Sequence, residues 1–253
     1  MNIISKKLCN TKFVFVFTPP FSGSTALAKI LNTSPKSMLL NSRGEGQWMI
    51  PGMRKPNPWN PEKKINWKRV KVRWMERVLS VESLVGQISI VIEKSPPNLV
   101  RYKNLLDNFP NHELIVYNRN PYANCSSTFH RLHVEKNLTS KERQLILQKL
   151  AEDWLYRSRI CKRIIDSEDV LFFTYERLCS NPEKVVKSII SRIPDLVKID
   201  HTLEIQVKDY PSQRLRNFNT EQINKLSKKE KDMISEVLNK EGDLINFFGY
   251  TLV

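Results

Sequence analysis

Residues that could bind an anion follow the first apolar run of the sequence. The segment KFVFVFTPPFSGSTALAKILNTSP (12–35) passes from a strand-like run through a turn into an amphipathic helix. Gly23 permits close backbone approach, and Ser24 and Thr25 place hydroxyls beside the free N–H groups of a helix start. Such a start attracts phosphate or sulfate. The Gly-x-x-x-x-Gly-Lys-Ser/Thr spacing of a nucleotidase is absent and Phe21 stands where a cation is expected, so an ordinary capped turn is the alternative.

Basic and hydroxyl side chains follow two further apolar runs. Lys94 comes directly after Glu93, where an ammonium could neutralise charge on a leaving group. An ordinary surface lysine at the end of a strand would explain the residue equally well. Arg119 leaves the run that ends at Asn118, and Ser127 lies two turns into the following helix. An arginine fork and a hydroxyl could hold one phosphate from two directions.

Two later segments add candidates. Tyr175 opens the stretch YERL after the last strand-like run, and RLRNFNT (214–220) is a basic loop ahead of a helix. Arg214 and Arg216 of this loop could bind an anion. The alternative is that both side chains are simply exposed to solvent on a connecting loop.

The elements that must position these residues alternate along the chain. Four runs are nearly continuously hydrophobic, as expected for strands covered on both faces of a parallel sheet: 13–18, 88–93, 113–118 and 170–175. Helical patterns separate and follow them: 24–31, 63–84, 97–109, one that opens at 120–121, one after the capping box at 139–142, 182–193 and 221–239. This alternation predicts a doubly wound α/β layer, in which ligands bind beyond the carboxyl ends of the strands.

Composition limits the class of protein. The chain has 253 residues with no repeat or low-complexity tract, so a single domain over 1–253 is expected. A formal charge of +15 favours anionic partners such as nucleotides, acidic glycans, nucleic acid or a lipid surface. Residues 52–80 carry nine Lys/Arg against two Glu, a net charge of +7. This segment could bind an anionic partner or could equally be the solvent-exposed face of a helix.

No run is long enough to span a bilayer, and the N-terminal run is too short for a signal peptide. Four cysteines without a Cys-x-x-Cys pair favour reduced thiols, and a cytoplasmic location is expected.

Two anion sites at neighbouring strand ends, without a P-loop lysine, suit a nucleotide that is phosphorylated at both ends. In this combination the sequence resembles the sulfotransferases that use 3′-phosphoadenosine 5′-phosphosulfate (PAPS) and release 3′-phosphoadenosine 5′-phosphate (PAP). The resemblance implies a P-loop-NTPase-like, three-layer α/β/α fold with a central parallel sheet and no metal. It implies that the first loop holds the 5′-phosphosulfate through Phe21, Ser22, Gly23, Ser24, Thr25 and Ala26.

Three later segments also resemble the family. The spacing of Arg119 and Ser127 matches the family's pair for the 3′-phosphate. The segment LFFTYERLCSNP (171–182) looks like its Tyr-Glu-x-Leu region, and RLRNFNTEQ (214–222) is similar to its late basic loop.

The family resemblance also bears on the general base. Small-molecule members use a histidine two residues after a lysine in the motif that follows the second strand. In this chain that lysine is Lys94, and the place of the histidine is taken by Pro96. Protein-tyrosine and glycan members use a glutamate after the first helix, and GEGQWMIP (44–51) looks like that segment, which makes Glu45 the candidate base. The alternative is that Glu45 only forms a structural ion pair with a nearby lysine or arginine. His130 is the second candidate for the general base. Phe21 departs from the family's lysine or arginine, so Lys94 is expected to take over more of that charge.

The sequence therefore predicts transfer of a sulfuryl group to an acceptor hydroxyl of a carbohydrate or other biomolecule, and an anionic glycan or peptide is the candidate acceptor. Tryptophans 67 and 74 favour such an acceptor only if they are not core residues, which is their commoner role. Alternatives are a P-loop-type nucleotide kinase, which would need a first-loop lysine and a magnesium-binding carboxylate, a catalytically impaired relative, and a binding module for anionic polymers. No nucleic-acid motif supports the last alternative.

Overall fold

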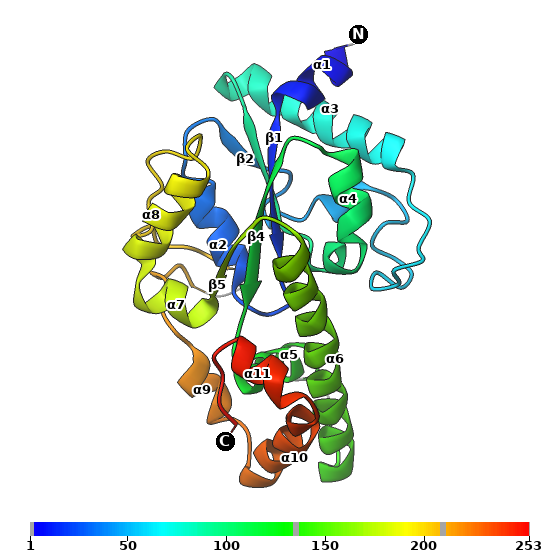
Figure 1. The fold of residues 1–253 in the computed structure, drawn as a ribbon, viewed down its shortest axis with the longest axis vertical. Helices are drawn as coiled ribbons and strands as arrows, with labels where there is room; N and C mark the ends of the chain where they lie inside the picture. The colour runs from blue at the N-terminus through cyan, green and yellow to red at the C-terminus, as the bar shows by residue number, and fades with distance from the viewer. Residues whose placement is uncertain (1–2, 134–136, 208–210, 253) are drawn as a thin grey trace.

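The computed structural model describes residues 3–133, 137–207 and 211–252, and its centre is a five-stranded parallel sheet (Figure 1). The spatial order is β2-β3-β1-β4-β5, with β1 (Lys12–Phe17) in the middle. The other strands are β2 (Ser37–Leu39), β3 (Ile90–Glu93), β4 (His112–Asn118) and β5 (Val170–Thr174). Because the chain moves to opposite sides of β1 to form β3 and β4, the loops after these three strands meet at one edge of the sheet.

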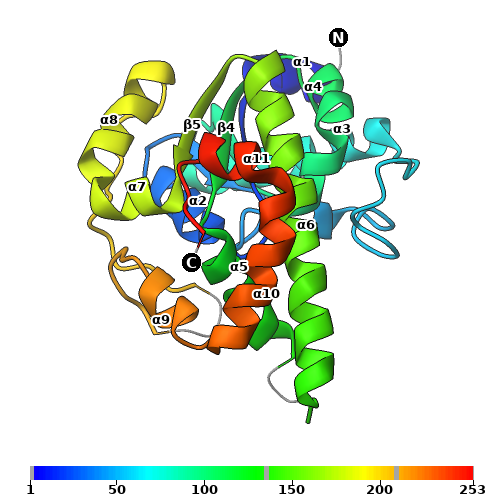
Figure 2. The same cartoon turned by 60° about the horizontal axis from the view of Figure 1, so that its bottom comes forward.

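Helices cover both faces of the sheet, which gives the expected three layers (Figures 1 and 2). One face carries α2 (Ser24–Leu31), α7 (Tyr175–Ser180) and α8 (Pro182–Arg192), and the other carries α3 (Trp67–Val85), α4 (Tyr102–Asn108) and α6 (Ser140–Ser167). The remaining helices among the described residues are α1 (Ile3–Asn10), α5 (Pro121–Leu132), α9 (Asn219–Ile223), α10 (Lys228–Leu238), α11 (Gly242–Phe247) and the 3-10 turns η1 (Gly46–Met49), η2 (Pro96–Arg101) and η3 (Asn239–Glu241).

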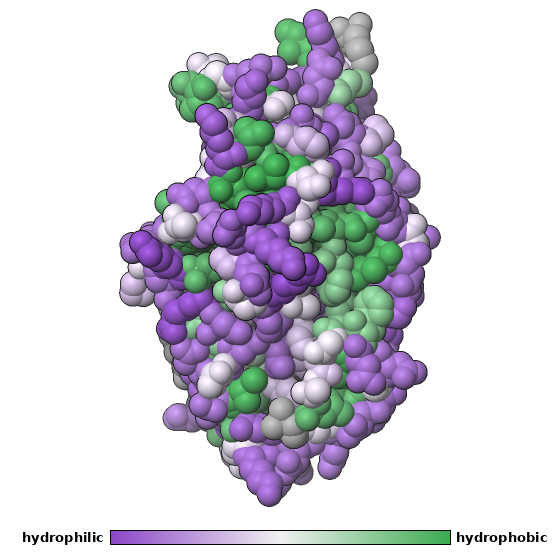
Figure 3. Space-filling model, turned by 60° about the vertical axis from the view of Figure 1, so that its left-hand side comes forward, coloured by the Kyte–Doolittle hydropathy of each residue, from purple (hydrophilic) through white to green (hydrophobic). Residues whose placement is uncertain are grey.

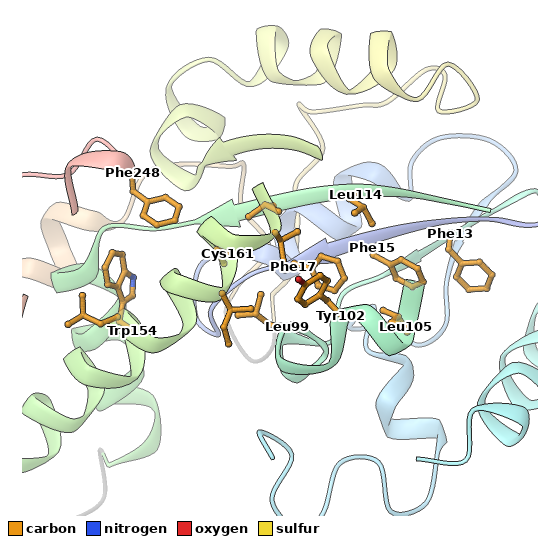
Figure 4. Close-up of a cluster of buried hydrophobic side chains, with 14 of the residues drawn as sticks. Phe13, Phe15, Phe17, Leu99, Tyr102, Leu105, Leu114, Trp154, Cys161 and Phe248 are labelled. Carbon is orange, nitrogen blue, oxygen red and sulfur yellow. The ribbon is translucent and has the colours of Figure 1, made fainter. Parts of the chain in front are cut away.

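Side chains of β1 alternate between the two layers, so the strand is buried on both sides. Phe13, Phe15 and Phe17 face α3, α4 and α6, whereas Val14 and Val16 face α2 and α8. Phe13, Phe15 and Phe17 form a row along one face of the sheet in Figure 4, and the Phe13 and Phe109 ring centroids lie 4.6 Å apart. The continuous hydrophobic runs of the sequence have this two-sided burial as their physical cause.

The predicted alternation of strands and helices is confirmed, and the differences lie at element ends. Asn66 caps α3 by accepting a hydrogen bond from the Arg69 N–H, so the helix begins at Trp67 rather than at residue 63. The pattern over 221–239 divides into α9 and α10, because Ser227 forms a capping box with Glu230 and starts a new helix. The capping box at Thr139 is present as expected. The helices α1, α7 and α11 and the three-residue strand β2 are not among the elements predicted from the sequence.

The basic segment before and within α3 presents its charges to solvent. Lys68, Arg69, Arg73 and Arg77 are exposed, while Trp74 is completely buried and Trp67 packs against the core. The two tryptophans are therefore packing residues. The face that carries α2, α7 and α8 is also largely hydrophilic (Figure 3). None of the described helices combines the length and apolar character needed to cross a bilayer.

Candidate active site

A side chain from α5 fixes the conformation of the loop after β1. The Asn124 amide donates to the Pro20 carbonyl at 2.7 Å and to Ser22 Oγ at 3.2 Å, and Ser22 Oγ donates to the Pro19 carbonyl. Gly23 caps α2 with a φ of 83°, a backbone conformation that favours glycine. The Ala26 N–H already donates to the Gly23 carbonyl at 3.0 Å, so the N–H groups ahead of Ala26 at this helix start are the ones that could receive an anion.

Gly23 also allows a close approach that a side chain would prevent. A Cβ at this position would lie 2.7 Å from Tyr175 Cδ2, so the tyrosine ring packs directly against the loop backbone. The Tyr175 hydroxyl donates to the Arg216 carbonyl at 2.8 Å and accepts from the Phe218 N–H at 3.1 Å. The late loop and the first loop are thus held together through one aromatic side chain.

A buried lysine reaches the first loop from β3. Lys94 is 2% exposed, and its Nζ lies 3.0 Å from Thr25 Oγ1 and 3.0 Å from Glu45 Oε1. Thr25, Glu45 and Lys94 come from three separate segments, yet one ammonium contacts both other side chains. The structure therefore places a cation at the loop although Phe21 supplies none.

Glu45 is held by two further hydrogen bonds to Oε2. Trp48 Nε1 donates at 2.9 Å, and the Gln47 amide donates at 3.1 Å. Burial raises the pKa of Glu45, but the charge and hydrogen bond of Lys94, aided by Trp48 and Gln47, outweigh it and leave the pKa below its ordinary value. The carboxylate is therefore ionised and held in one orientation, and the lowered pKa makes it a weaker base than a free glutamate.

A second cation flanks the first loop from β4. Arg119 Nη1 donates to the Phe21 carbonyl at 3.0 Å, its Nε donates to Asn219 Oδ1 at 2.9 Å, and its guanidinium lies 4.4 Å from the centre of the Tyr175 ring. Its remaining nitrogen, Nη2, is buried and has no partner among the described residues. An unpaired buried N–H is costly, so a bound anion is the natural partner for Nη2.

A hydrogen-bond network that was not predicted from the sequence holds Arg119 in place. Glu176 Oε1 accepts from the Asn219 amide at 2.6 Å and from the Asn120 N–H at 2.9 Å, and Oε2 accepts from the Tyr250 hydroxyl. Asn219 joins this carboxylate to Arg119. The sequence offered one signal, since Glu176 lies two residues after the end of β5 and ligands of such sheets bind beyond the carboxyl ends of the strands.

The other candidates occupy different surroundings. Ser127 is half-buried on α5, and its hydroxyl makes no hydrogen bond to the described part of the chain. Arg214 is exposed, while Arg216 pairs with Glu221 at 2.6 Å and stacks on Phe218.

His130 lies at the other end of α5, among charged residues of different elements. Burial lowers its pKa, and Lys225 and Arg143 add to that effect. The structure does not bring His130 into contact with Glu45, Lys94 or Thr25. No cluster of three or more His, Cys, Asp or Glu side chains that could hold a metal ion occurs among the residues that the structure describes.

Most of the chain matches a known protein family. Residues 14–194 match the Sulfotransferase family, so the chain belongs to that family. None of the curated protein sequences matches it.

Solved structures agree on the fold. A sulfotransferase from Alicyclobacillus acidocaldarius has a TM-score of 0.61 at 14% identity, covering 94% of this chain and 96% of its own. Sulfotransferase STF9 from Mycobacterium avium has a TM-score of 0.64 at 11% identity, covering 98% of this chain and 80% of its own. Mouse sulfotransferase SULT7A1, solved with PAP, has a TM-score of 0.52 at 13% identity, covering 98% of this chain and 93% of its own.

Proposed function

We propose that this protein transfers a sulfuryl group from PAPS to a hydroxyl of a carbohydrate or other biomolecule. The observation that carries the proposal is the placement of Lys94 and Arg119 on the two sides of one glycine-containing loop, each within 3.0 Å of a loop atom. Two cations that follow β3 and β4, the strands on either side of β1, can hold a nucleotide that bears negative charge at both ends. The unpaired Nη2 of Arg119 fits such a ligand.

The residues divide between the two ends of the nucleotide. The first loop, Phe21 to Ala26, would hold the 5′-phosphosulfate through backbone amides and the hydroxyls of Ser24 and Thr25. Arg119 and Ser127 would hold the 3′-phosphate, and the late loop with Arg214 and Arg216, tethered by Tyr175, would cover it. When bound, PAPS supplies an electrophilic sulfur whose bond to the bridging phosphate oxygen breaks as the acceptor oxygen attacks.

The chain's own part in the reaction is proton transfer and charge neutralisation. Glu45 would take the proton of the acceptor hydroxyl, and Lys94 would neutralise the negative charge that develops on the leaving phosphate. The contact between Lys94 Nζ and Thr25 Oγ1 of the loop supports this role. It would substitute for the cation that Phe21 does not provide.

Ligand binding and transfer test the proposal separately. PAP at roughly 100 times its Kd should stabilise the fold by about 2.7 kcal/mol, seen as a rise of several degrees in Tm. ATP with Mg²⁺ should give a much smaller shift, and the reverse order would favour a nucleotide kinase. Transfer of radiolabelled sulfate from PAPS to a panel of glycans, lipids and peptides then identifies the acceptor. Binding of PAP without transfer to any acceptor would indicate a catalytically impaired relative.

A further inference from the structure

An exposed tryptophan lies directly beside the candidate base. Trp48 is 44% exposed, although its Nε1 donates to Glu45 Oε2 at 2.9 Å. It belongs to η1, which begins immediately after Glu45, and the Gln47 N–H of the same turn is fixed by Ser95 Oγ. The indole is therefore held at the edge of the candidate active site with part of its surface free.

Two arginines surround this indole. The Arg54 guanidinium carbon lies 3.5 Å from the centre of the Trp48 ring, and that of Arg43 lies 5.7 Å away. A stacked guanidinium satisfies its flat face and leaves its N–H edge free to bind a carboxylate or sulfate. Neither arginine forms an ion pair with an acidic side chain in the described ranges.

The local charge is therefore positive. Lys94 and Glu45 neutralise each other, which leaves the charges of Arg43 and Arg54 uncompensated at the site. Burial lowers the pKa of the Lys94 ammonium, Glu45 opposes that lowering, and the charge of Arg43 adds to it. An anionic group bound here would offset this repulsion.

We propose that Trp48, Arg43 and Arg54 form an acceptor subsite for an acidic carbohydrate, whose carboxylate or sulfate binds the arginines while a hydroxyl of the same residue or its neighbour meets Glu45. This inference rests on the proposed function. A carbohydrate fits better than a peptide because a single indole separates the base from the arginines. An acidic sugar carries its hydroxyls and its charge on one ring, whereas in a tyrosine peptide the hydroxyl and any carboxylate lie on separate flexible side chains.

Equilibrium binding to the protein saturated with PAP tests the subsite without requiring turnover. The probe is a disaccharide of glucuronic acid and N-acetylgalactosamine, compared with its carboxyl-reduced neutral form by calorimetry. The acidic form should bind about tenfold or more tightly than the neutral form, as expected for charge-assisted hydrogen bonds. Arg54→Gln and Arg43→Gln should each remove most of that preference, and binding should weaken with added salt.

Matched variants keep the outcomes separate. Arg69→Gln changes an exposed arginine on α3 outside this cluster and should leave the preference unchanged. Arg54→Lys keeps the charge but loses the planar fork, so it should retain only part of the preference. Arg43 is exposed, so its variant tests the proposal even if substitution of Arg54 disturbs the fold.

Three results would overturn the subsite. Equal binding of the acidic and neutral disaccharides would exclude recognition of charge. Weaker binding of PAP itself by Arg54→Gln would assign the arginine to the donor site. Binding of an acidic tyrosine peptide in place of the disaccharide would exclude the carbohydrate. Failure of the wild-type protein to bind PAP, in contrast, would contradict the proposed function and not the subsite alone.

Discussion

Lys94 Nζ lies 3.0 Å from Glu45 Oε1 and 3.0 Å from Thr25 Oγ1, so one buried ammonium contacts both the candidate base and the loop expected to bind the donor. An anion in that loop would compete with Glu45 for the same charge. Glu45 would then become more basic only when the loop is occupied, which would couple proton removal to donor binding.

Replacing the candidate base should separate binding from transfer. Glu45→Gln keeps the shape of the side chain but cannot take a proton, so kcat should fall by about 10²–10⁴. The Tm rise caused by PAP should persist. The exposed Glu62 supplies a control, since Glu62→Gln should leave kcat unchanged. Loss of transfer in His130→Asn, with normal transfer in Glu45→Gln, would make His130 the base instead.

The ion pair should also give the protein a specific pH dependence. The pKa of Glu45 is lowered below its ordinary 4.5 in the folded state, so its contribution to stability is present above about pH 4.5. That contribution is lost as the pH falls through the lower folded pKa. Lys94→Met removes the main cause of the lowering and leaves a partly buried carboxylate without its cation, at a cost of about 1–3 kcal/mol near neutral pH.

Denaturant unfolding between pH 3 and pH 7, a range set roughly by the ordinary pKa of Glu45, measures this effect. The stability difference between wild type and Lys94→Met should grow as the pH rises. In a Glu45→Gln background, the change in the free energy of unfolding caused by Lys94→Met should no longer depend on pH over this range. Parallel curves for wild type and Lys94→Met would show that the two side chains do not interact in solution.

Gly23 offers a test of the contact between the two loops. Alanine at this position meets both a φ of 83° and the Tyr175 ring at 2.7 Å, so Gly23→Ala should cost about 1–3 kcal/mol and weaken PAP binding. Gly52 is a matched control, because its φ is 81° but a Cβ there would meet nothing within 4 Å. The difference in Tm between the two variants isolates the close approach of Tyr175. Equal effects of both substitutions would argue against that approach.

Arg119 and Ser127 should differ in what their loss does to the free protein. Arg119→Lys loses the planar fork that binds Phe21 and Asn219, so both Tm and PAP affinity should fall, the latter by about 10–100-fold. Ser127→Ala should leave Tm nearly unchanged, since the hydroxyl binds no described residue, while PAP affinity falls by up to about tenfold. Calorimetric titration with PAP measures both. Unchanged affinity in both variants would move the 3′-phosphate site elsewhere.

By itself the sequence determined four of the five strands, the helices that alternate with them and the strand ends where the candidate residues would gather. Continuous hydrophobic runs such as residues 13–17 require burial on both faces, and this requirement is local enough to read from residue types. Caps such as Thr139 are equally local. The short strand β2 was not readable, because three residues carry too little pattern.

Only the tertiary structure decided which polar groups meet. Glu45 and Lys94 are 49 residues apart, and Arg119 and Asn219 are 100 residues apart, so no spacing in the sequence encodes their contacts. These pairs form because β1 lies between β3 and β4, which brings the loops of separate segments to one edge of the sheet. The position of the Arg54 guanidinium over the Trp48 ring depends in the same way on how the loop after η1 packs, which residue types alone do not reveal.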